Sequence, residues 1–216
     1  MGNIFSYNLD INKNAYLNWD MDYNNDSSDL KVMADGFALA AERLMNNVFA
    51  DNRDKKADIL IFPILFSAYH SIELYLKAIL YKIDQIQGNR KIHKGHDIKK
   101  LLEEMEKQIK KIDSNRNDLT QHLSELNKYI NDVYEYIAKN ANNPKVEFAR
   151  YPLDQQGNPF FYIINPEELI DPNKPRNFVV NMEELQKSHQ KITKSLQSIF
   201  YLYEAQLEGE EQAWEH

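Results

Sequence analysis

The sequence predicts a mainly α protein, an up-down bundle of about five helices with a small β-hairpin (about 145–164) inserted before the last helix. Two observations support this class. Apolar residues recur every three or four positions through most of the chain, as expected for helices that bury one face. That period breaks near residue 145, where closely spaced apolar and aromatic residues surround the turn-forming stretch DQQGNP.

We expect one folded domain over residues 27–207, preceded by a polar arm (1–26) and followed by an acidic tail (208–216). The 216 residues are enough to bury a substantial core, and no stretch rich in proline or glycine divides them. The arm is expected to pack on the domain through its aromatic residues, among them Trp19 and Tyr23.

Five helices follow from the apolar spacing. The first begins at Asp26 to Ser28, where capping residues stand together, and extends to Val48. The second runs from Ala57 to Gln87, and it is apolar around so much of its circumference that several other helices should contact it. The remaining three are predicted from about Asp97 to Ile112, from Asn117 to Ala138 and from Met182 to Leu207.

Composition excludes several classes of protein. The chain has no cysteine, so disulfides and thiolate chemistry are absent, and no apolar run reaches the ~18–20 residues that span a bilayer. A net charge of −7 argues against binding of nucleic acid by the whole surface, although a local basic patch is compatible with it. We expect a cytoplasmic protein with no membrane association, no cofactor and no metal.

Three ionisable residues interrupt the apolar second helix at steps of three and four: His70, Glu73 and Lys77. On a helix they form one stripe, with Glu73 and Lys77 in the favourable order for an ion pair. Such a stripe is either a solvated edge or, because this helix is apolar nearly all round, a partly buried site with shifted pKa values.

Basic residues gather where the third helix begins, after Gly88 ends the second: Arg90, Lys91, His93, Lys94, His96, Lys99 and Lys100. Unpaired N–H groups at a helix start attract anions, and Asp97 is well placed to cap this one. A phosphate or an RNA backbone is the natural partner, and a solvated basic loop is the alternative. The spacing of His93, His96 and Asp97 loosely suits a metal, but no second ligand cluster matches it.

Two further motifs carry candidate residues. Arg150 and Tyr151, before Pro152, are able to stack on a base or clamp a carboxylate, and Arg150 is alternatively a partner for Glu73. Arginine and histidine separated by five residues occur twice, at Arg90 to His96 and at Arg116 to His122. Such a pair would suit RNA cleavage, with histidine as general acid or base and arginine stabilising the phosphate.

The order of three motifs, SIELYLKAIL, KGHDIKKLLEE and ARYPLD, resembles the HEPN superfamily over residues 57–152. Glu73, Leu76, Lys77 and Leu80 match its central helix, Gly95, His96 and Asp97 its next helix start, and Arg150 to Pro152 an R-Y-P segment found in some branches. The resemblance implies a bundle of four or five helices, frequent homodimers, nucleotide or RNA binding, and roles in toxin–antitoxin or phage-defence systems. In ribonuclease members, a polar residue follows the motif arginine, as Asn117 follows Arg116 here.

We therefore expect a HEPN-like domain that binds a nucleotide or RNA phosphate, in a defence or toxin–antitoxin module, as a homodimer and with a cognate protein partner. The expected ligand-binding residues are His70, Glu73, Lys77, His96, Asp97, Arg150 and Tyr151. One alternative is a metal-independent endoribonuclease that uses Arg116, Asn117 and His122. Another is a non-enzymatic interaction or dimerisation module.

Overall fold

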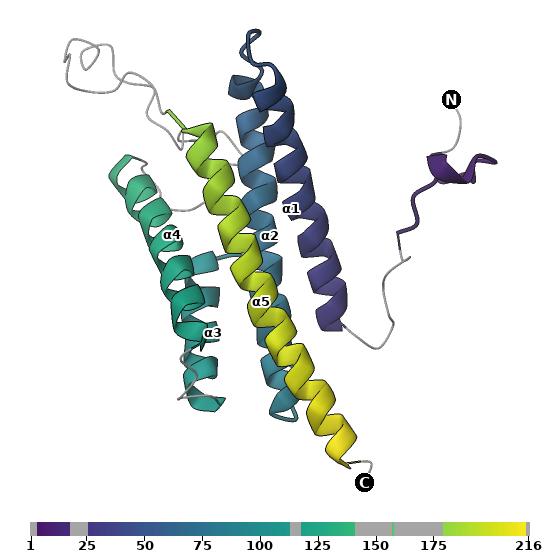
Figure 1. Cartoon of the computed structure of the whole chain (residues 1–216), viewed down its shortest axis with the longest axis vertical. Helices are drawn as coiled ribbons and strands as arrows, with labels where there is room; N and C mark the ends of the chain where they lie inside the picture. The colour runs from purple at the N-terminus through teal and green to yellow at the C-terminus, as the bar shows by residue number, and fades with distance from the viewer. Residues whose placement is uncertain (1–3, 18–25, 113–117, 141–156, 158–178, 215–216) are drawn as a thin grey trace.

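The computed structural model describes residues 4–17, 26–112, 118–140, 157 and 179–214, and this part of the chain is mainly helical (Figure 1). It contains a short 3-10 helix, η1 (Ile11–Lys13), and the helices α1 (Asp26–Ala50), α2 (Ala57–Ile86), α3 (Ile98–Ile112), α4 (Asp118–Asn140) and α5 (Met182–Trp214). The predicted mainly α class is confirmed. No strand occurs in the described residues, and the predicted hairpin at 145–164 lies outside them except for Gly157.

The helices do not alternate strictly up and down as predicted. His96, just before α3, contacts Glu73 in the middle of α2, whereas Gln108 near the end of α3 contacts Gln87 just after α2. Helices α2 and α3 therefore run in the same direction. The connecting segment (residues 87–97) has to run back along α2 before α3 begins.

Helix α2 forms the centre of the bundle and contacts α1, α3 and α5. Its buried side chains, among them Ile72, Leu76, Ile79 and Ile83, join apolar residues from every other α-helix in one core. A second cluster around Met45 and Ile64 fills the space between the C-terminal half of α1 and the N-terminal half of α2. The apolar character that predicted several helical neighbours thus reflects a true central position.

By length and composition, α2 is also the one described helix that qualifies as a membrane span. However, 56% of its most apolar window is buried inside the bundle, as in the core helix of a soluble protein. This property alone is weak support for a membrane location.

The ends of α2 and α5 show how the residues near a helix end decide where the helix stops. Gly88 has φ +73°, and the amide N–H of Asn89 donates to the Asp84 carbonyl at 2.8 Å, so α2 ends here as predicted. Helix α5, by contrast, passes its expected end at Leu207 and continues to Trp214. The residues around Gly209 are mostly glutamate and glutamine, which favour helix, and one glycine costs only about 1 kcal/mol.

In the described part of the N-terminal arm, residues 4–17, two aromatic side chains are largely exposed. Phe5 is 81% exposed and Tyr7 is 65% exposed. A local turn holds this segment together, because the Asn14 side chain accepts from the Asn8 N–H and donates to the Asn8 carbonyl, both at 2.8 Å. Trp19 and Tyr23 lie outside the described residues.

Candidate functional site

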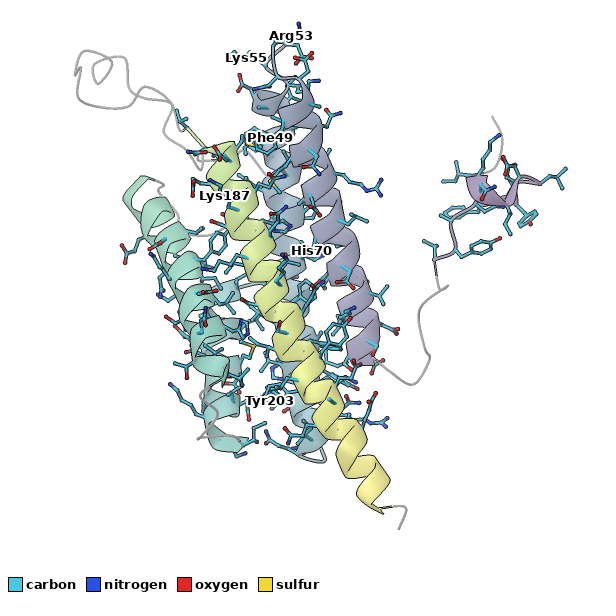
Figure 2. The ribbon with its side chains drawn as sticks, in the orientation of Figure 1. Phe49, Arg53, Lys55, His70, Lys187 and Tyr203 are labelled. Carbon is cyan, nitrogen blue, oxygen red and sulfur yellow. The ribbon has the colours of Figure 1, made fainter. Side chains whose placement is uncertain are left out.

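Glu73 is the centre of a cluster of ionisable groups on α2, near the middle of the bundle, where His70 is labelled in Figure 2. Oε1 of its carboxylate lies 2.7 Å from Lys77 Nζ and 2.9 Å from His96 Nδ1. The other oxygen, Oε2, lies 3.6 Å from His70 Nδ1. The Glu73 side chain is only 3% exposed. The structure thus brings together four of the predicted site residues, and the stripe on α2 is not a solvated edge.

The environment of Glu73 favours its charged form. Burial alone would raise the pKa of the carboxyl group, but hydrogen bonds from the surrounding His and Lys side chains outweigh burial and lower that pKa to about 2. The 3.6 Å separation from His70 is too long for an ordinary hydrogen bond. We therefore attribute the lowering mainly to Lys77 and His96.

His70 belongs to this cluster but faces the protein interior. Its ring stacks on Phe66 at 5.5 Å and meets the Phe37 ring edge-on at 4.5 Å. His70 therefore packs α1 against α2. This position makes it a poor candidate for direct contact with a large ligand.

His96 is the member of the cluster that faces solvent, with a side chain 64% exposed. Since the Glu73 carboxylate only accepts hydrogen bonds, Nδ1 of His96 carries the proton in their contact. Nε2 then points away from that bond. This arrangement of carboxylate and imidazole fixes the ring and leaves one nitrogen for a phosphate or for proton transfer.

The start of α3 is occupied by protein groups. Asp97 caps it as predicted, accepting from the Lys100 N–H at 3.2 Å. The Tyr134 hydroxyl donates to the same Asp97 carboxylate at 3.2 Å. Asp97 thus satisfies one of the amides that were expected to attract an anion, and its carboxylate places a negative charge at this helix start.

Three tyrosines beside this helix start were not singled out in the sequence: Tyr69 on α2 and Tyr129 and Tyr134 on α4. They line a small void of about 10 Å³ together with apolar residues. Burial raises the pKa of Tyr129 to about 12, and burial and the Asp97 carboxylate raise that of Tyr134 to about 12, so both hydroxyls stay protonated at neutral pH. Tyr69 lies four residues before Glu73, a helical spacing that could have marked it as a neighbour of the site, whereas no such spacing links Tyr134 of α4 to Glu73.

The connecting segment (residues 87–97) is fastened to α2 by two histidines. His96 binds Glu73, and His93 Nε2 lies 2.6 Å from the Asp84 carboxylate, where both side chains are buried. Because His93 and His96 bind different carboxylates, they are not placed together as ligands of one metal ion. The exposed residues of the segment and of the start of α3 are strongly basic: Arg90, Lys91, Lys94, Lys99 and Lys100.

The other predicted residues do not join this cluster in the described structure. His122 lies on α4 with Nδ1 at 3.0 Å from Ser195 Oγ of α5. It is twelve residues from Tyr134, or about 18 Å along the helix. Arg116, Asn117, Arg150 and Tyr151 lie outside the described residues.

Comparison with known proteins agrees with the geometry. Residues 54–150 match the model of the HEPN domain, a range that contains α2, α3, α4 and the Glu73 cluster. No curated protein and no solved structure matches the chain. A HEPN domain is consistent with a function related to nucleotides or RNA. The match over residues 54–150 supports membership of the HEPN superfamily.

Proposed function

We propose that this protein binds the phosphate groups of a nucleotide or of RNA around His96. The observation that carries the proposal is the contact between His96 and Glu73, which holds an exposed imidazole beside a basic surface. We further propose that it acts in the cytoplasm, within a defence or toxin–antitoxin module, as a homodimer with a cognate protein partner. The match to the HEPN domain supports this setting.

Charge supports a local site of this kind. The chain has a net charge of −7, yet residues 88–100 contain five lysine or arginine side chains and one carboxylate. Exposed cations close to an imidazole attract phosphate, and an otherwise acidic surface discourages contact elsewhere. Glu73 supports binding indirectly, because its contact with Nδ1 holds the His96 ring in place and leaves Nε2 free of that contact.

Binding is tested with fluorescently labelled single-stranded RNA and, separately, with ATP, by anisotropy at several salt concentrations. We expect Lys91→Gln/Lys94→Gln to weaken binding and to reduce the salt slope by about 0.7 for each phosphate interaction that the substitutions remove. The matched control is Lys107→Gln/Lys110→Gln, which removes two exposed cations from α3 and leaves residues 88–100 unchanged. Equally weakened binding in the two double variants would refute a site at His96.

The ribonuclease alternative makes a separate prediction. His122 contacts Ser195, and its expected partners Arg116 and Asn117 lie outside the described residues. If the chain cuts RNA without added metal, cleavage that is abolished in His122→Ala and retained in His96→Ala would assign the reaction to the α4 motif. Cleavage abolished only in His96→Ala would assign it to the Glu73 cluster. If neither RNA nor ATP binds, an interaction module becomes the better account.

A further inference from the structure

Besides apolar residues in the shared core, a row of polar side chains joins α1 to α5. The two helices are antiparallel, and hydrogen bonds cross between them about once per turn. These are Lys31 to Tyr201 (2.7 Å), Asp35 to Gln197 (3.0 Å), Glu42 to Gln190 (3.2 Å) and Asn46 to Gln186 (2.7 Å). Such a contact holds two helices side by side without the close interdigitation of an apolar interface.

Between the Asp35 and Glu42 contacts, α1 and α5 enclose a surface hollow of about 470 Å³. Ala38 and Leu39 of α1 form one wall, and His189, Thr193 and Lys194 of α5 form the other. The volume falls within the range of small-molecule sites in proteins, about 300–1,000 Å³. The hollow is built by α1 and α5, whereas the Glu73 cluster lies at the contact of α2 and α3.

A buried histidine in the wall of this hollow lacks a hydrogen-bond partner on one nitrogen. His189 is 2% exposed, and its Nε2 lies 3.2 Å from the Ala38 carbonyl oxygen. A carbonyl only accepts, so Nε2 carries the proton, and burial lowers the pKa of His189 and keeps the ring neutral. Nδ1 is then an acceptor, and it is buried without a partner.

Thr193, one turn further along α5, adds a second unpaired group. Its Oγ1 is buried and has no hydrogen-bond partner, although a helical threonine often bonds to the carbonyl four residues before it. Buried polar groups are almost always paired, and each unpaired one costs about 1–3 kcal/mol. Both residues line the hollow, so a ligand that reached these atoms from the hollow would supply the missing partners.

We propose that the α1–α5 hollow binds a small organic cation through an amine or guanidinium group. Nδ1 of His189 requires a donor, and both groups are donors only. The Glu42 carboxylate supplies negative charge at one end, because it accepts from the neutral Gln190 amide and forms no ion pair within the described residues. Asp35, at the other end, is already paired with Lys31 at 2.8 Å, so Glu42 is the main anionic contact.

The remaining lining residues fit an alkyl amine. Ala38 and Leu39 offer apolar contact for a carbon chain, and Leu39 is 48% exposed. Lys194 is exposed, and its long side chain allows the ammonium group to stay in solvent away from a bound cation. The same head group occurs in free amines and in the lysine and arginine side chains of a partner protein.

The test is titration of the full-length protein with agmatine and with a neutral-flanked arginine pentapeptide, followed by calorimetry and by the ring nitrogen signals of His189. We expect saturable binding of at least one probe and a shift of the Nδ1 signal on binding. Glu42→Gln should weaken binding ~10-fold or more, and Thr193→Val should weaken it ~5-fold, as expected for hydrogen bonds to a charged group.

Matched controls separate this site from general charge effects. Glu103→Gln removes an exposed carboxylate on α3, and Thr120→Val removes an exposed hydroxyl on α4, so neither should alter affinity. Binding of agmatine alone would identify a free amine as the ligand, and binding of the peptide alone a partner side chain. No saturable binding of either probe, or equal affinity in Glu42→Gln, would overturn the proposal.

Discussion

Replacing Glu73 with glutamine tests the charge arrangement at the centre of the candidate site. Glutamine keeps the shape of the side chain but cannot carry the charge that faces Lys77 and His96. Lys77 is only 14% exposed, so in the variant its ammonium stays largely buried without a counter-charge. We expect Glu73→Gln to destabilise the fold at neutral pH.

The expected size follows from the pKa of Glu73. Folding lowers this pKa from 4.5 to about 2. Because one pKa unit corresponds to about 1.4 kcal/mol, the charged carboxylate stabilises the folded state by about 3 kcal/mol. Since the folded-state pKa is the lower one, this stabilisation is complete above about pH 4.5 and disappears as the pH falls towards 2.

Urea denaturation followed by circular dichroism measures the difference in unfolding free energy between the native protein and Glu73→Gln. The difference should be about 3 kcal/mol at pH 7 and should shrink as the pH is lowered below 4.5. Glu103→Gln, at an exposed position of α3, serves as the control and should change stability by less than about 0.5 kcal/mol. A difference at Glu73 that stays constant with pH, or that equals the control, would refute the reasoning.

Three further predictions concern the helices and the connecting segment around the site. Ile79→Ala removes a fully buried side chain and should lower the unfolding free energy by about 2–5 kcal/mol in the same denaturation assay. The control Ile59→Ala, at a residue 75% exposed, should change the unfolding free energy by less than about 0.5 kcal/mol. Tyr75→Phe removes the buried hydroxyl that contacts Asp35 and should cost about 1–2 kcal/mol; an unchanged denaturation midpoint would show that this contact contributes nothing. His93→Ala breaks the contact with Asp84 and should speed tryptic cleavage within residues 87–97, and unchanged cleavage rates would show that this contact does not hold the segment.

The helices could be predicted because their signals are local. The apolar period, Gly88 after α2 and Asp97 before α3 act over a few residues, and the structure confirms both ends. The end of α5 was missed because one glycine weakens a helix without ending it.

The sequence by itself determined the mainly helical class, the resemblance to the HEPN domain and the stripe of His70, Glu73 and Lys77, because each depends on residue types at short fixed spacings. Only the tertiary structure decided that α3 runs parallel to α2 and that the connecting segment returns along it, which brings His96 to Glu73. It also decided that the Tyr134 hydroxyl of α4 meets the Asp97 carboxylate at the start of α3. These features join residues distant in the sequence, and no local period specifies which of them meet in space.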